Sequence, residues 1–221
     1  MQLPLKLGFL ASHGGSGMRA ILEAIRAGAL DAQACVMISN NVGAGAHDVA
    51  REYGVASLVL NTRLMGDEDT LDRAIERTLV DHGVNLMPLS GYMRMLGPRV
   101  LARYRNRILN VHPALLPAFG GKGMYGDRVH AAVLEAKAPV SGATVHIVDE
   151  EYDHGPVVAR LEVPVEANDT IDTLRARVQA AEQALFVRVL KDIAASKIDL
   201  DQVAARLPGR GQARQKQSPR V

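Results

Sequence analysis

Short apolar runs alternate with helical patterns through the first half of the chain. In residues 70–82, for example, Leu71, Ile75 and Leu79 recur at four-residue steps, which places them on one helical face, and Gly83 ends the pattern. Strands separated by helices of this length form right-handed βαβ units, so the pattern predicts a parallel sheet. The expected strands are residues 5–11, 34–39, 57–60, 84–89 and 107–111, and the expected helices are residues 18–27, 46–53, 70–82 and 97–104.

The second half of the chain has a different pattern. Residues 112–127 are rich in glycine and contain proline, which predicts a long structured loop before a helix at 128–136. Two β-branched runs follow at 141–148 and 156–165. The acidic connection of residues 149–155 between them is too short for a crossover helix, so we expect the two strands to pair antiparallel.

The longest helical pattern lies at residues 170–193, where Thr170 is a typical N-cap. These elements together predict an α/β fold. We expect a Rossmann-like open, mostly parallel twisted sheet, with helices on both faces and an antiparallel strand pair near the C-terminus. The length of 221 residues suits a single domain of residues 1–205, followed by a polar, basic tail at 206–221 that we expect to be disordered.

The net charge of +2 hides an uneven distribution. Residues 206–221 carry five lysine and arginine residues and no acid, and without them 21 basic and 24 acidic residues remain, a net charge of −3. The body of the protein is therefore mildly acidic, and we expect no nucleic-acid partner. The single cysteine, Cys35, excludes an intrachain disulfide and suits a reducing cytoplasm. No apolar run approaches the ~18 residues of a membrane span, and the first residues show no signal pattern.

A glycine-rich turn, His13-Gly14-Gly15-Ser16-Gly17, lies between the first expected strand and the first helix. Free amide groups at a helix N-terminus can hold an anion, helped by the helix dipole, and Ser16 adds a hydroxyl donor. The turn matches neither a Walker A loop nor G-x-G-x-x-G, so a single phosphate monoester is a better ligand than a dinucleotide. A tight turn that binds nothing explains the same residues equally well.

Three polar residues form a second candidate site. Asn110 and His112 are two apart at the end of an expected parallel strand, so they point the same way, at the sheet edge where open α/β sheets bind ligands. Asp153 lies in the acidic connection of residues 149–155. A carboxylate close to His112 would raise the pKa of its ring and fix its tautomer. Taken singly, each residue also has a structural explanation, as a turn former, a packed histidine or a solvated loop acid.

Three segments resemble the signatures of the folate-dependent formyltransferases. They are residues 110–117 (NVHPALLP), residues 141–146 (SGATVH) with 153–156 (DHGP), and residues 90–96 (SGYMRML). The turn at 14–17 resembles the phosphate loop of the branch that formylates a phosphoribosyl amine. The similarity extends from about residue 7 to about residue 190.

The resemblance implies an activity and a set of roles. The activity is transfer of a formyl group from 10-formyltetrahydrofolate, as co-substrate, to the amine of 5-phosphoribosylglycinamide in purine biosynthesis. We expect a cytoplasmic monomer or homodimer without a metal, whose N-terminal half binds the ribonucleotide and whose C-terminal half binds the folate. The implied catalytic residues are Asn110, His112 and Asp153; the implied ribonucleotide contacts are Gly14, Gly15, Ser16, Gly17 and Glu182; the implied folate contacts are Met93, Arg94, Leu96 and His146.

The implied chemistry is acyl transfer, in which charge develops on the formyl oxygen. We expect Asn110 and a protonated His112 to stabilise that oxygen, while Asp153 keeps His112 charged and helps to move a proton. His146 has an alternative explanation as a packed core residue. No paired-cysteine or H-E-x-x-H pattern suggests a metal.

The chain departs from the family pattern at two positions of the glycine turn: Gly17 stands where Asn is usual, and His13 where Gly is common. Arg63 and Glu68 are both present in the neighbourhood where the family contacts the folate tail, so the residues that contact the tail stay open. The same three catalytic residues could serve a 10-formyltetrahydrofolate hydrolase or a methionyl-tRNA formyltransferase, but we expect such proteins to carry a further N-terminal or C-terminal domain. A non-catalytic nucleotide-phosphate binder is the alternative from another class.

Overall fold

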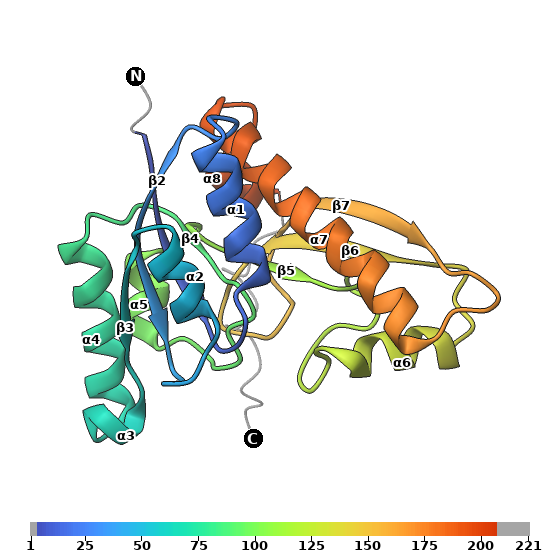
Figure 1. The fold of residues 1–221 in the computed structure, drawn as a ribbon, viewed down its shortest axis with the longest axis horizontal. Coiled ribbons are helices and arrows are strands. Elements are labelled where there is room, and N and C mark those ends of the chain that lie inside the picture. The colour runs from blue at the N-terminus through green and yellow to red at the C-terminus, as the bar shows by residue number, and fades with distance from the viewer. Residues whose placement is uncertain (1–3, 207–221) are drawn as a thin grey trace, which may run out of the picture.

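The computed structural model describes residues 4–206, in which strands and helices alternate for most of the chain (Figure 1). The strands are β1 (Leu5–Ala11), β2 (Ala32–Ser39), β3 (Ala56–Val59), β4 (Met87–Pro88), β5 (Ile108–His112), β6 (Val140–Ile147) and β7 (Val157–Pro164). The helices are α1 (Ser16–Arg26), α2 (Ala46–Glu52), α3 (Thr62–Met65), α4 (Glu68–Asp81), α5 (Pro98–Arg103), α6 (Asp127–Glu135), α7 (Ile171–Ala194) and α8 (Leu200–Ala205).

The strands form two ladders that meet side by side. In one, β1 pairs with β2 and β2 with β3, all parallel. In the other, β4 and β5 are parallel, β6 is antiparallel to β5, and β7 is antiparallel to β6. Isolated parallel bridges between Leu7 and Leu86 and between Leu10 and Leu89 join β1 to β4. The prediction of a mostly parallel sheet with an antiparallel pair near the C-terminus is confirmed.

The expected strand at 84–89 is reduced to the two residues of β4 because of Pro88. On the side facing β1, the N–H of Leu86 donates to Lys6 O and the N–H of Ser90 donates to Leu10 O. Pro88 stands between them and has no N–H to donate. On the other side the ladder to β5 continues, since Met87 and Leu89 donate to the carbonyls of residues 107 and 109.

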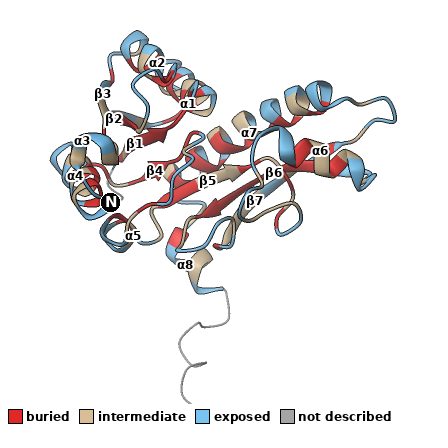
Figure 2. Ribbon diagram, turned by 90° about the horizontal axis from the view of Figure 1, so that it is seen from below, coloured by how far each residue is buried: buried red, intermediate tan, exposed pale blue. Residues whose placement is uncertain are grey.

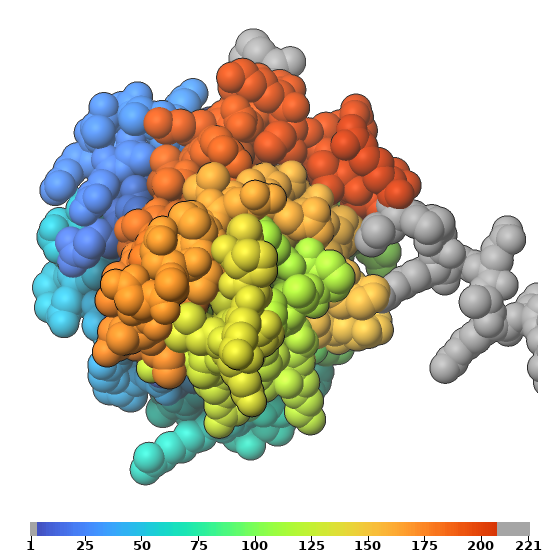
Figure 3. All heavy atoms as spheres, turned by 90° about the vertical axis from the view of Figure 1, so that its right-hand side faces the viewer, coloured from blue at the N-terminus to red at the C-terminus, as the bar shows by residue number. Residues whose placement is uncertain are grey.

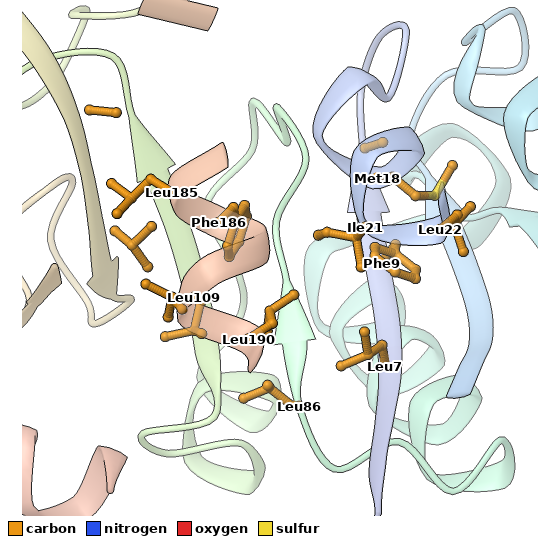
Figure 4. Close-up of a cluster of buried hydrophobic side chains, with 14 of the residues drawn as sticks. Leu7, Phe9, Met18, Ile21, Leu22, Leu86, Leu109, Leu185, Phe186 and Leu190 are labelled. Atoms are coloured by element: carbon orange, nitrogen blue, oxygen red, sulfur yellow. The ribbon is translucent and has the colours of Figure 1, made fainter. Parts of the chain in front are cut away.

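Helices cover both faces of the sheet, as predicted (Figures 1 and 2). One apolar core contains residues of α1, α2 and α7, and a second contains residues of α4 and α5. In Figure 4, Leu185, Phe186 and Leu190 of α7 lie on the same side of β4 as Leu109 of β5. The labelled residues of β1 and α1 lie on the other side of β4. The long helix α7 therefore packs against elements from both halves of the chain.

Side-chain caps mark the starts of four of the eight helices in residues 4–206. Thr170 caps α7 in a capping box, with its side chain accepting from Thr173 N–H, and Asp67 caps α4 by accepting from Thr70 N–H. The single-turn helix α3 and the short helix α8 were not expected; they begin at the side-chain caps Asn61 and Asp199. Such short helices leave almost no periodic pattern in a sequence.

At the end of the molecule where α6 lies, segments that are distant in the sequence pack together. Figure 3 shows residues around α6 beside the first turns of α7 and the strands β6 and β7. Arg175 of α7 pairs with Asp127 of α6 at 2.6 Å. The expected basic tail at 206–221 lies outside the described residues except for Arg206, and the single-domain boundary at 205 stays a prediction. Within residues 4–206 no helix is long and apolar enough to cross a membrane.

Candidate active site

Several of the predicted site residues lie at the carboxyl ends of parallel strands. The glycine turn follows β1, Met93 to Leu96 follow β4, and Asn110 and His112 belong to the end of β5. The loop after β2 contributes Asn40 and Asn41. Because carboxyl ends of parallel strands share one edge of a sheet, these segments meet at that edge.

Asn110 is held by a partner on the neighbouring strand. Asn110 of β5 and His146 of β6 are direct partners in the antiparallel ladder, and Asn110 Nδ2 lies 3.1 Å from His146 Nε2. His146 Nδ1 lies 3.0 Å from the carbonyl oxygen of Ile147, which can only accept. An N–H on Nδ1 donates to this carbonyl, and Nε2 faces the Asn110 amide and, at 3.6 Å, Asp153 Oδ1. The second N–H of that amide is available to a ligand.

Asp153 reaches the two histidines from the connection between β6 and β7. Its Oδ2 lies 3.4 Å from His112 Nδ1, and its Oδ1 lies 3.6 Å from His146 Nε2. Gly121 N–H also donates to Asp153 Oδ2, at 3.0 Å. The backbone of Asp153 has φ +54, and a Cβ at Gly155 would collide with the carbonyl oxygen of Ile147, so this connection is tightly folded against β6.

His112 is held on both sides of its ring. Its Nε2 donates to the carbonyl oxygen of Phe119 at 2.8 Å, which leaves Nδ1 to face Asp153. Only 3% of His112 is exposed, and 2% of His146. The loop of residues 113–126 thus closes over the histidine through the Phe119 carbonyl and over the aspartate through Gly121 N–H.

Burial and the Asp153 carboxylate act in opposite directions on His112. Removal from water lowers the pKa of the His112 ring below its ordinary value, and the nearby Asp153 carboxylate offsets this in part. Both ring nitrogens face acceptors, the Phe119 carbonyl and Asp153 Oδ2, so the expectation that Asp153 keeps His112 charged stays a prediction. Burial opposes ionisation of Asp153 as well, but contacts with His146, His112 and Gly121 N–H hold its pKa below the ordinary value.

The glycine turn borders a cavity of about 470 Å³, which is lined by residues of the β1 and β2 loops. Gly15, with φ +69, precedes α1, and Ser16 is its first residue. Gln179 Nε2 of α7 lies 3.2 Å from Ser16 Oγ. Gln179 was not predicted, although it stands three residues before Glu182 and hence on the same helical face. The lining residues are Ser12, His13, Gly14, Asn41, Gly43, Ala44 and Gly45.

Glu182 of α7 is partly exposed as a residue, but its carboxyl group is enclosed by protein. Burial raises the pKa of Glu182 to about 8, because the charged form loses its water shell. A carboxyl in this state accepts or donates a hydrogen bond according to its protonation. The Glu182 carboxyl can therefore form a hydrogen bond with either a donor or an acceptor group of a polar ligand at α7.

The predicted folate segment lines a larger cavity of about 590 Å³. Met93, Arg94 and Leu96 all border it, together with apolar side chains of α4 and with Tyr152, the neighbour of Asp153. Arg94 pairs with Glu68 at 2.6 Å, and both side chains are exposed. Asn110, His112, Asp153 and His146 do not border this cavity; His146 instead contacts Asn110 and Asp153. Tyr152 was not predicted from the sequence. It lines the cavity and directly precedes Asp153 in the chain.

Within residues 4–206, no group of three or more histidine, cysteine or acidic residues is arranged to hold a metal ion. The site therefore consists of an amide donor, two buried histidines and an ionised carboxylate, close to a glycine-lined cavity and a partly apolar cavity.

Comparison with known proteins assigns this arrangement to a class. A model of the formyl transferase family matches residues 5–190, and the chain belongs to that family. Its relatives include the phosphoribosylglycinamide formyltransferase of Escherichia coli, which is 32% identical over 200 residues that make up 90% of this chain and 92% of that protein. The chloroplastic phosphoribosylglycinamide formyltransferase of Arabidopsis thaliana is 39% identical over 87% of this chain, which spans 66% of the plant protein's length.

Solved structures of similar proteins agree with the fold. The crystal structure of glycinamide ribonucleotide transformylase 1 from Symbiobacterium toebii superposes with a TM-score of 0.83 and 33% identity, covering 89% of this chain and 90% of that one. The phosphoribosylglycinamide formyltransferase of Brucella melitensis superposes with a TM-score of 0.80 and 35% identity, covering 87% and 97% of the two chains.

Proposed function

We propose that the protein transfers a formyl group from 10-formyltetrahydrofolate to the amine of 5-phosphoribosylglycinamide, a step of purine biosynthesis. The observation that carries this proposal is the buried cluster of Asn110, His112 and Asp153 at the sheet edge that also bears the glycine turn and the folate segment. The names of the similar proteins from Escherichia coli and Symbiobacterium toebii support the same substrate.

The reaction begins with attack of the ribonucleotide amine on the formyl carbon. A new C–N bond forms, and negative charge develops on the formyl oxygen of a tetrahedral intermediate. The bond between the formyl carbon and N10 of the folate then breaks, which gives the formylated ribonucleotide and tetrahydrofolate. The proton lost by the amine balances the proton gained by N10.

Asn110 and His112 provide donors for the formyl oxygen. The amide of Asn110 gives one N–H to His146 and retains the other. His112 Nε2–H is directed at the Phe119 carbonyl, and in the proposed reaction the formyl oxygen takes the place of that carbonyl as acceptor. Donors fixed in a buried site stabilise developing charge more strongly than donors in water.

Asp153 accounts for the proton. Its pKa is held below the ordinary value, so Asp153 is ionised at neutral pH, and it faces His112 Nδ1 at 3.4 Å. The amine proton enters this pair through a water molecule and is delivered to N10 as the C–N bond breaks. The pair of Asp153 and His112 is suited to this role because a proton can be held between the two groups during the reaction.

We assign the two substrates to the two cavities, which are lined by loops at the same edge of the sheet as this cluster. We assign the ribonucleotide phosphate to the turn of Gly14, Gly15, Ser16 and Gly17, with Gln179 and Glu182 of α7 contacting the rest of the ribonucleotide. We assign the pterin to the cavity lined by Met93, Arg94 and Leu96. His146 does not line this cavity, and its assigned role is to orient Asn110 and Asp153. We further propose that the enzyme works in the cytoplasm, as a monomer or homodimer.

An activity assay tests the proposal. Conversion of 10-formyltetrahydrofolate to tetrahydrofolate is followed with and without 5-phosphoribosylglycinamide. Strict dependence on the ribonucleotide, with formylated ribonucleotide as the product, is the expected result. Turnover without the ribonucleotide would instead identify a hydrolase, and no turnover under either condition would support the non-catalytic binder.

A further inference from the structure

Ser12 is the residue after β1. Hydrogen bonds of its hydroxyl, N–H and carbonyl groups join its own loop to the loops after β2 and β4. Its hydroxyl donates to Asn40 Oδ1 at 2.6 Å and accepts the N–H of Met93 at 2.9 Å. Its own N–H donates to the carbonyl of Gly91 at 3.1 Å, and its carbonyl accepts Asn41 Nδ2 at 2.6 Å. Only 2% of Ser12 is exposed, so these bonds are shielded from water.

The three loops belong to different substrate sites. Asn41 lines the cavity beside the glycine turn, as does Ser12 itself. Met93 lines the cavity of the folate segment. The Ser12 hydroxyl is thus a hydrogen-bond link between a segment assigned to the ribonucleotide and a segment assigned to the folate.

The backbone offers little alternative connection at this boundary. Pro88 removes one donor from the ladder between β1 and β4, and only two isolated bridges join these strands. The loops that follow β1 and β4 are held in register by the bond from Ser90 N–H to Leu10 O, by the bond from Met18 N–H to Ser90 Oγ and by the bonds of the Ser12 N–H and hydroxyl. Of these groups, only the Ser12 hydroxyl also bonds to the loop after β2.

We propose that Ser12 is a positioning residue that couples the two substrate sites. When the ribonucleotide orders the loops after β1 and β2, the Ser12 hydroxyl holds Met93 and the folate segment in the binding conformation. Each substrate therefore increases the affinity of the other by the same factor, fivefold or more on the usual scale of such couplings, ~5–150-fold. This inference rests on the proposed function, since it takes the two cavities as the sites of the two substrates.

Ser39 provides a matched control. It is also a buried serine at the carboxyl end of a strand, and its hydroxyl accepts the N–H of Asn41 at 3.1 Å. It bonds to the loop on the ribonucleotide side, whereas Ser12 also bonds to Met93. Ser39→Ala should therefore weaken ribonucleotide binding without changing the coupling between the sites.

The experiment measures tetrahydrofolate binding by calorimetry with and without 5-phosphoribosylglycinamide, a pair that cannot react because tetrahydrofolate carries no formyl group. In the wild type we expect the dissociation constant of tetrahydrofolate to fall at least fivefold when the ribonucleotide is present. In Ser12→Ala the ratio of the two constants should approach one, and in Ser39→Ala it should stay at the wild-type value. Asn40→Ala, which leaves the Ser12 hydroxyl without its acceptor, should also lower the ratio and serves if Ser12→Ala does not fold.

Two outcomes overturn the inference. One is a wild-type ratio near one, and the other is an unchanged ratio in whichever of Ser12→Ala and Asn40→Ala folds. A merely structural role would lower thermal stability in both serine variants without changing the ratio. Failure of the proposed function is recognised separately, because the wild type would then show no ribonucleotide-dependent formyl transfer.

Discussion

Asn110 and His146 lie directly opposite each other in the antiparallel ladder of β5 and β6, and their side chains are 3.1 Å apart. The ladder register therefore determines where the amide of the proposed oxyanion donor points. His146 also contacts Asp153 at 3.6 Å. One buried histidine thus supports two of the three proposed catalytic residues.

Replacing His146 should impair turnover more than binding. In His146→Ala, Asn110 loses the acceptor that orients its amide, and Asp153 loses a neighbour that stabilises its charge. We expect kcat to fall about tenfold to hundredfold, the effect of leaving a buried polar group unpaired, with small changes in both KM values. His154→Ala is the control, because His154 adjoins Asp153 but contacts Asp149. Equal losses in the two variants would argue against a role for His146.

Asp153→Asn should abolish most of the activity while preserving the ribonucleotide site. The amide has the shape of the carboxylate but cannot accept the amine proton, so kcat should fall about 10²-fold to 10⁴-fold. The KM of the ribonucleotide should remain within about twofold, since the assigned contacts lie on α1 and α7. Asp149→Asn, in the same connection, should retain activity. Near-normal turnover of Asp153→Asn would rule out the assigned role.

Glu182 should make stability depend on pH. Its pKa is raised by burial from 4.5 to about 8, so the folded protein holds a proton that the unfolded chain releases near pH 4.5. The resulting stabilisation is complete below about pH 4.5 and is lost as the pH rises through about 8. Glu182→Gln keeps a neutral side chain at every pH. Its melting temperature, measured by calorimetry, should match that of the wild type near pH 5 and exceed it at pH 9. A difference that does not change with pH would contradict the raised pKa.

Glu68→Gln should improve binding of a folate with an anionic tail. Glu68 pairs with Arg94 at the rim of the larger cavity, and the substitution leaves the guanidinium free for another anion. Both side chains are exposed, so KM should fall by at most about fivefold, and the difference from the wild type should shrink with added salt. Arg94→Gln should raise the same KM. Asp81→Asn, at the other end of α4, removes an exposed acid away from the cavity and should leave KM unchanged.

The alternation of apolar runs and helices predicted the order of the elements well, because each buried strand and amphipathic helix leaves a periodic pattern. The two-residue spacing of Asn110 and His112 likewise predicted neighbouring side chains at a strand end. The shortening of the fourth strand depends on Pro88, whose effect can be judged only once the two neighbouring strands are known.

The extent to which His112 is removed from water could not be predicted from residue types. The sequence places an acid within reach, which favours the protonated ring, but it does not reveal that only 3% of His112 remains exposed. The contact of Gln179 with Ser16 and the four hydrogen bonds of Ser12 depend on segments brought together by folding, so no local pattern announces them.

Pro88 also has a mechanical consequence. A continuous ladder resists sliding between neighbouring strands, whereas the boundary of β1 and β4 is interrupted at its centre. This boundary therefore resists shear less than an uninterrupted ladder would, and it separates the glycine turn from the folate segment. Beyond the interruption the hydrogen bonds of Ser12 and Ser90 tie the two sides together, so a displacement of one side is passed to the other through these two residues.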